Sequence, residues 1–165
     1  MAFFSQPAEA LELKLEDLSA SVEVAAVFSL SLDNPHLAFG LINPGENKIL
    51  GEGHFFHEAK CRSNNGRSWY LKAQLISLRL LGKEYSLPYS CLKWKISEST
   101  GAYRQQTGSD FTAFSSEPEL VYTSEGDDPK GREVILRFQY SLTLPREAPA
   151  GNYVGQIIFT MTEGT

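Results

Sequence analysis

Strict alternation of apolar and polar residues runs through four long segments of this chain of 165 residues and constrains its fold more than any other feature. Successive side chains of a β-strand point to opposite faces of a sheet, so alternation gives each strand one apolar and one polar face. On a helix the same apolar positions would be scattered around the circumference. The pattern therefore predicts four long strands, over residues 22–32, 69–75, 134–144 and 153–161.

Shorter alternating segments lie between these strands, bounded by turns that are rich in Gly, Pro and Asn. They predict weaker strands over residues 37–41, 54–60, 75–80, 85–88, 92–97 and 120–123. The strands 75–80 and 85–88 are expected to pair as a hairpin across Gly82 and Lys83, whereas residues 97–109 are expected to form an exposed loop. Many short strands without a convincing interior helix predict an all-β protein, an antiparallel Greek-key (immunoglobulin-like) β-sandwich with an N-terminal extension.

Composition and charge narrow the classes of function. The net charge of −5 argues against binding of nucleic acid, because neutralising phosphates needs a basic surface. No apolar run approaches the ~18–20 residues that a membrane-spanning helix needs. The sequence contains no nucleophile elbow, phosphate-binding glycine loop or HExxH motif, so we expect neither an enzyme nor a bound cofactor.

The two cysteines, Cys61 and Cys91, leave two states open. A disulfide between them would close a loop of about thirty residues and would stabilise the fold by roughly 3–4 kcal/mol. Export of the protein would favour this disulfide. Two reduced, separately buried thiols are the alternative, and no CxxC motif indicates zinc or redox chemistry.

Tyrosines have one expected structural role and one candidate binding role. Tyr153 follows a Pro/Gly corner at the start of a predicted strand, which is typical of a tyrosine corner, whose hydroxyl binds the backbone upstream. Tyr70, Tyr89 and Tyr103 are candidates for stacking on sugars if they are exposed. Cross-strand packing is the alternative for these three side chains.

Two groups of residues contain side chains of metal-ligating types, but neither is expected to bind a metal. His54 and His57, with His36 or Cys61 assisting, suggest a metal, but strand residues three apart face opposite ways. The acidic stretch 125–128 resembles a calcium loop but lacks the ligand spacing of an EF-hand, so it is interpreted as a solvated turn.

The N-terminal residues 1–18 are expected to form an arm, separate from a sandwich domain over residues 19–165. Leu11, Leu13 and Leu15 alternate with charged residues, as in a strand. Leu11, Leu15 and Leu18 instead fit the spacing of a helix. An extended arm, a short helix packed on its own domain and disorder all stay open. The small-x-small triplet at residues 8–10 has the form of a signal-peptidase site, but no basic or apolar region precedes it.

Three stretches, residues 28–45, 63–71 and 140–162, carry a family resemblance. They resemble secreted bacterial surface β-sandwiches, namely spore coat protein U-like and other chaperone–usher fimbrial subunits, which commonly end in a Pro-Ala-Gly-x-Tyr strand like residues 149–153. Trp69-Tyr-Leu71 is similar to the Trp-x-Leu strand of WxL-type surface domains. The second such strand reads Phe159-Thr-Met161 here and departs from that pattern.

The resemblance implies a secreted or cell-surface protein, with a periplasmic chaperone and an outer-membrane usher as partners. A sandwich that lacks a strand exposes apolar residues and unpaired backbone groups, which another copy can cover with its own strand. We therefore expect a structural subunit of a pilus, fimbria or coat, in which the leucine-bearing arm of one copy completes the sheet of the next by donor-strand complementation. A monomeric surface module that binds cell-wall glycan or another surface protein is the alternative.

Overall fold

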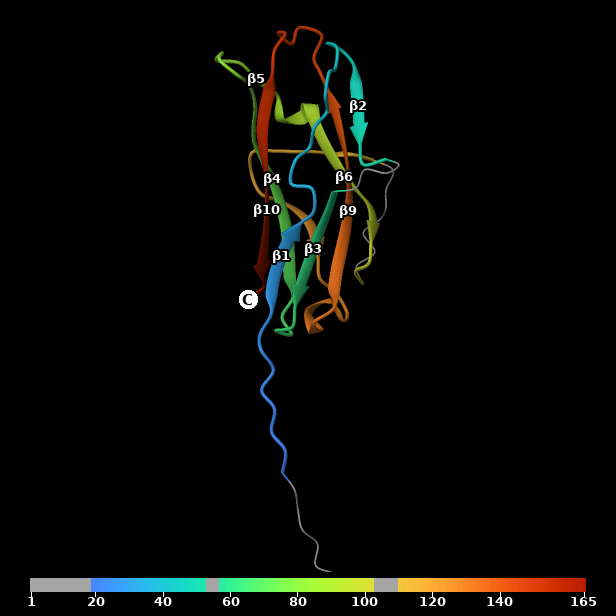
Figure 1. Cartoon of the computed structure of the whole chain (residues 1–165), viewed down its shortest axis with the longest axis vertical. Helices are drawn as coiled ribbons and strands as arrows, with labels where there is room; N and C mark the ends of the chain where they lie inside the picture. Colours follow the sequence, from blue (N-terminus) through green and yellow to red (C-terminus); the bar gives the residue numbers. More distant parts are fainter. Residues whose placement is uncertain (1–18, 53–56, 103–109) are drawn as a thin grey trace, which may run out of the picture.

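The computed structural model describes residues 19–52, 57–102 and 110–165 and folds them into two antiparallel sheets that pack face to face (Figure 1). The first sheet contains β1 (Phe28–Leu32), β2 (Asn47–Leu50), β3 (His57–Ser63), β6 (Leu92–Ser99), β7 (Thr112–Ala113) and β9 (Glu133–Thr143). Its strand order is β1-β3-β9-β6-β7, and β2 pairs with the part of β9 that β3 does not reach.

The second sheet has four strands: β4 (Trp69–Leu80), β5 (Ser86–Leu87), β8 (Glu119–Thr123) and β10 (Tyr153–Glu163). β4 is its centre, with β10 on one edge and with β5 and β8 at different heights on the other. The only helices among the described residues are two short 3-10 helices, η1 (Tyr89–Cys91) and η2 (Asp128–Lys130). None of the described helices has the length and apolar character to cross a membrane.

The central strands β4 and β9 supply about half of the buried hydrophobic residues of the core. Every second residue is buried over residues 69–75 of β4 and 134–140 of β9, namely Trp69, Leu71, Ala73 and Leu75 and then Val134, Leu136, Phe138 and Tyr140. Burying an aliphatic or aromatic side chain of this size contributes about 1.5–3 kcal/mol. The predicted all-β antiparallel sandwich is thereby confirmed, whereas its Greek-key, immunoglobulin-like connection pattern stays a prediction.

The predicted hairpin is also present, and the two strands predicted over residues 69–80 form the single strand β4. Leu78 pairs with Leu87 and Arg79 pairs with Ser86. Gly82 in the connecting turn has a φ of +77°, a backbone conformation that favours glycine.

Two predicted strand segments are not strands. Residues 37–41 form no strand, because Gly40 adopts a φ of +68° that interrupts the alternation. Leu37 and Phe39 still pack against the core, but Leu41 is 93% exposed and Ile42 takes the next inward position. The first predicted strand, over 22–32, begins only at Phe28, because its partner β3 ends at Ser63. The alternation does not predict the short strands β2 and β7.

The corner before β10 is closed by Tyr153. Its hydroxyl donates a hydrogen bond to the carbonyl of Pro149 at 2.7 Å, which is the upstream backbone contact that the sequence predicts. The ring of Tyr153 also lies edge-on to Tyr85, with the centroids 6.2 Å apart. This corner fixes the entry of the chain into β10.

Candidate assembly site

The two sheets are open on the same side of the sandwich. Among the described residues, β1 pairs only with β3 and β10 pairs only with β4, so each has one edge without a strand partner. The ring of Phe159 in β10 lies 5.9 Å from the ring of His57 in β3 and 5.3 Å from that of Phe138 in β9. β10 therefore packs over β3 and β9, on the side of the sandwich where β1 forms the edge of the first sheet.

Apolar side chains stay part-exposed along this open side. Leu30 and Leu32 of β1 pack against the core but are only half-buried, and so are Ile157, Phe159 and Met161 of β10. An edge strand presents unpaired backbone N–H and C=O groups and is a template for another strand. A strand added to the free edge of β10 would extend the second sheet on this open side, next to these part-exposed side chains.

An extended segment, residues 19–27, leaves the sandwich as the continuation of β1 (Figure 1). Val22 and Val24 in this segment are 89% and 77% exposed. Both occupy even positions, in phase with Leu30 and Leu32, which face the core. The alternation thus carries apolar residues past the end of the sheet, where the described residues offer no partner. The predicted arm and its donor residues lie outside the described residues: Leu11, Leu13, Leu15 and Leu18.

A buried histidine lies beneath β10, between the two sheets. The side chain of His57 is surrounded by the rings of Phe138, Tyr140 and Phe159, and His57 is 3% exposed. Its Nδ1 and the Tyr140 hydroxyl are hydrogen-bonded at 2.5 Å. Burial lowers the pKa of His57 below its ordinary value of 6.5, and this effect outweighs the opposite influence of the Asp33 carboxylate. Burial also raises the pKa of Tyr140, so both groups are neutral at neutral pH.

We expect the free energy of unfolding to fall as the pH drops below about 6.5, because His57 is neutral in the folded protein. Between its lowered folded pKa and 6.5, only the unfolded chain holds the proton, so acid favours unfolding. Where this difference is complete, the loss is about 1.4 kcal/mol per pH unit. Urea titrations from about pH 7.5 to about pH 5 measure it.

Two histidine variants separate this effect from other titrations. His57→Gln keeps a hydrogen-bonding group beside Tyr140 but cannot titrate, so the pH dependence below 6.5 should disappear. His36 is exposed, so His36→Gln should keep the wild-type dependence. A wild-type slope in His57→Gln would contradict the assignment.

Cys61 and Cys91 are both free and buried, so the candidate disulfide is not formed. Cys61 pairs with Val134 on β9, and Leu92, the neighbour of Cys91, pairs with Leu142. These two partners are eight residues apart, which is about 26 Å along the strand, whereas the Cα atoms of bridged cysteines lie about 4.4–6.8 Å apart. The structure thus has the separately buried thiols of the alternative, and burial raises the pKa of Cys61 to about 12.

The sequence predicts a solvated acidic turn over residues 125–128, but the structure buries one of its carboxylates. Asp128 is fully buried. Its carboxylate accepts hydrogen bonds from the Tyr122 hydroxyl and from the backbone N–H groups of Ala102 and Glu125. The carboxylate is therefore used within the fold. Across residues 19–52, 57–102 and 110–165, no three side chains of the metal-ligating types gather in one place.

Of the candidate sugar-stacking tyrosines, the two that the structure describes, Tyr70 and Tyr89, do not form one platform. The Tyr89 hydroxyl donates to the Ile76 carbonyl at 3.1 Å, and the half-buried Tyr70 lies near the start of β4. Tyr70 and Ile76 are six residues apart on one strand, which is about 20 Å. Tyr103 lies outside the described residues.

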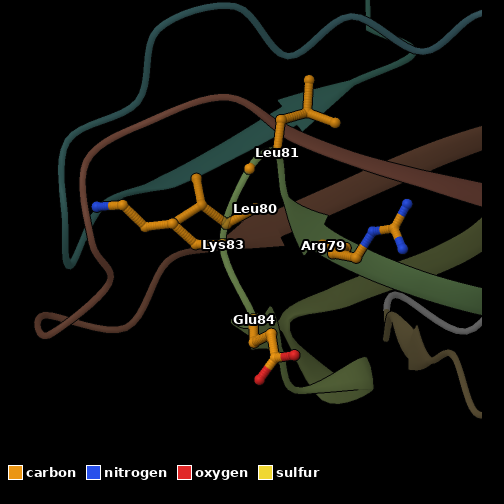
Figure 2. Close-up of a pocket in the computed structure, with 6 residues that line it drawn as sticks. Arg79, Leu80, Leu81, Lys83 and Glu84 are labelled. Carbon is orange, nitrogen blue, oxygen red and sulfur yellow. The ribbon is translucent and has the colours of Figure 1, made fainter.

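A shallow hollow of about 350 Å³ lies at the turn between β4 and β5 and is lined by residues 79–84. Figure 2 shows that Arg79 and Lys83 point to opposite sides of this turn and that Glu84 points away from both. The charged groups do not converge on a common point. This hollow is therefore not a candidate ligand site.

Comparisons of the chain with protein-family models, with curated proteins and with solved structures found no match. From the geometry alone, the candidate assembly site consists of the open edges of β1 and β10 and the projecting segment 19–27. Sequence reasoning places the donor residues before residue 19 and misses Val22 and Val24, which the structure leaves exposed. Their alternation is a usable signal, but it does not distinguish a core strand from a strand that lacks a partner.

Proposed function

We propose that this protein is a structural subunit of an extracellular bacterial filament, in which the N-terminal strand of one copy completes the sandwich of the next. The observation that carries the proposal is an extended segment, residues 19–24, whose apolar side chains Val22 and Val24 have no partner among the described residues, beside a sandwich whose edge strands are open on one side. A head-to-tail contact of this kind is heterologous and does not close on itself, so it links copies into a filament.

The acceptor in this proposal is the free edge of β10. Main-chain hydrogen bonds to an edge strand supply affinity, and alternate side chains that enter pockets supply specificity. Residues 19–24 reach about 20 Å beyond Ala25 when extended, the length of an ordinary strand. Burial of Val22 and Val24 would contribute about 1.5–3 kcal/mol each before ordering costs. The donor leucines predicted at 11, 13, 15 and 18 would lengthen the same contact.

The proposal extends to the route of assembly. The resemblance to chaperone–usher subunits supports an immunoglobulin-like Greek-key sandwich that is exported to the cell surface. It also supports delivery by a periplasmic chaperone and an outer-membrane usher. A chaperone would protect the open side until the next copy covers it, because an exposed apolar edge otherwise promotes aggregation.

Electron microscopy and sedimentation of the full chain, beside a chain that lacks residues 1–24, test the proposal. The full chain should form filaments, whereas the truncated chain should stay monomeric and fold, because its strands begin at Phe28. A synthetic peptide of residues 9–24 should bind the truncated chain, and a scrambled peptide of the same composition should not.

Two results would contradict the proposal. One is a truncated chain that forms filaments as readily as the full chain. The other is a full chain that stays dispersed and sediments with cell walls, which would favour the alternative, a monomeric module that binds cell-wall glycan or another surface protein.

A further inference from the structure

Asn64, directly after the last residue of β3, binds the segment that precedes β1. Its backbone N–H donates to the carbonyl of Val27 at 3.1 Å. Its side-chain Oδ1 accepts a hydrogen bond from the Val27 N–H at 2.6 Å, and its Nδ2 donates to the Ala25 carbonyl at 2.9 Å. Among the described residues, Ala25 is the last point at which the sandwich holds this segment by hydrogen bonds.

The side-chain amide of Asn64 replaces backbone groups that β3 no longer supplies. A regular antiparallel ladder would use the carbonyl of residue 64 for Val27 and the N–H of residue 66 for Ala25. The chain turns here, however, because Gly66 has a φ of +73° and directs its N–H to the Pro129 carbonyl, 2.9 Å away. Oδ1 and Nδ2 of Asn64 make the two missing hydrogen bonds and so extend the ladder past the end of β3.

The turn that carries Asn64 is itself fixed to the body of the protein. Besides the contact of Gly66 with Pro129, the N–H of Gly131 donates to the Ser63 carbonyl at 2.7 Å. The guanidinium of Arg62 donates to the Gly131 carbonyl at 3.0 Å. Asn64 is therefore held on both sides of the turn.

We infer that Asn64 is a positioning residue that keeps residues 25–27 in line with β1, so that β1 and the projecting segment form one continuous strand shared by two copies. This inference rests on the proposed function. One end of the strand belongs to the copy's own first sheet, and residues 19–24 add to the edge of β10 in the next copy. A strand with a fixed exit direction sets the angle between successive copies. Without the side chain of Asn64, the segment would pivot close to Phe28.

Hydrogen exchange and electron microscopy of the full-length Asn64→Ala variant test this inference. The Val27 amide loses its acceptor and should exchange at least about tenfold faster. The Asp33 amide, which donates to the Glu58 carbonyl at the other end of β1, should keep its wild-type rate and thereby report an intact fold. Filaments should still form but lose straightness, measured as a shorter persistence length.

Two further variants isolate the role of the side chain. Asn65→Ala removes a side chain of the same turn that donates to Glu163 and not to the segment, so it should match the wild type in both measurements. Asn64→Asp keeps an acceptor for Val27 but no donor for Ala25, so the Val27 amide should stay protected while the filaments lose straightness.

Wild-type exchange at Val27 in Asn64→Ala, or filaments as stiff as the wild type, would overturn the inference. If the wild-type chain forms no filaments, the proposed function fails. In that case the exchange rate of Val27 still decides whether Asn64 holds the segment in line with β1.

Discussion

Replacing Asp128 by alanine is expected to lower the free energy of unfolding by about 4 kcal/mol. Asp128 is 0% exposed, and its carboxylate accepts hydrogen bonds from the Tyr122 hydroxyl at 2.7 Å, the Ala102 N–H at 3.0 Å and the Glu125 N–H at 3.1 Å. Alanine would remove this acceptor from the buried Tyr122 hydroxyl and from two part-buried N–H groups, and a hydrogen bond to a charged group contributes about 1.5–3 kcal/mol. For a domain of this size, the melting temperature should fall by roughly 10 °C.

The adjacent residue provides a matched control. Asp127 has a side chain that is 74% exposed and that pairs with Lys130 at the surface, so Asp127→Ala should cost less than about 1 kcal/mol. Asp128→Asn should fall between the two, because one carbonyl oxygen still accepts hydrogen bonds while the amide nitrogen cannot. Thermal and urea unfolding measure all three variants. Equal stability of Asp127→Ala and Asp128→Ala would contradict the role assigned to the buried carboxylate.

The strands of the core could be predicted from the sequence because burial of one face requires alternation. β4, β9 and β10 are confirmed where the pattern places them, and the hairpin around Gly82 is confirmed as well. Alternation records only that one face is apolar, and it does not state which strand lies beside it. For that reason it predicts a strand over residues 22–27, where β3 has already turned away at Asn64.

Other features depend on backbone or side-chain directions that spacing does not encode. Gly40 breaks the strand predicted over residues 37–41 by adopting a positive φ, although its neighbours are apolar in the right order. Asp128 lies in an acidic, turn-like sequence but points into the protein. The distance between Cys61 and Cys91 follows from the register of β3 and β6 against β9, which a single sequence does not reveal.

The candidate assembly site could likewise be predicted from the sequence only in part. The exposed valines at 22 and 24 carry a sequence signal, because they continue the alternation of β1. The free edge of β10 carries none, because strand order alone makes it an edge, and strand order is a property of the whole chain. The hydrogen bonds of Asn64 to residues 25 and 27 likewise arise from where the turn lies in space.

Val24→Asp is expected to weaken the association of copies by about a thousandfold, with no loss of folding. Val24 is 77% exposed in the described fold, so the substitution removes no packing within the copy. In the assembled state its side chain would enter the apolar space beside β10. There the substitution forfeits the burial of valine and places a carboxylate among part-buried side chains such as Phe159 and Met161, which together cost about 4 kcal/mol.

Ser21→Asp is the control with the same change in charge. Residue 21 is exposed and of opposite parity to Val24, so its side chain would face away from the neighbour's core and assembly should stay close to the wild type. Sedimentation and electron microscopy measure assembly, and the melting temperature confirms folding. If both variants assemble equally well, the segment does not enter a neighbour with its even face inward. If both fail equally, charge repulsion between copies of net charge −5 is the dominant effect, and the proposed strand register is wrong.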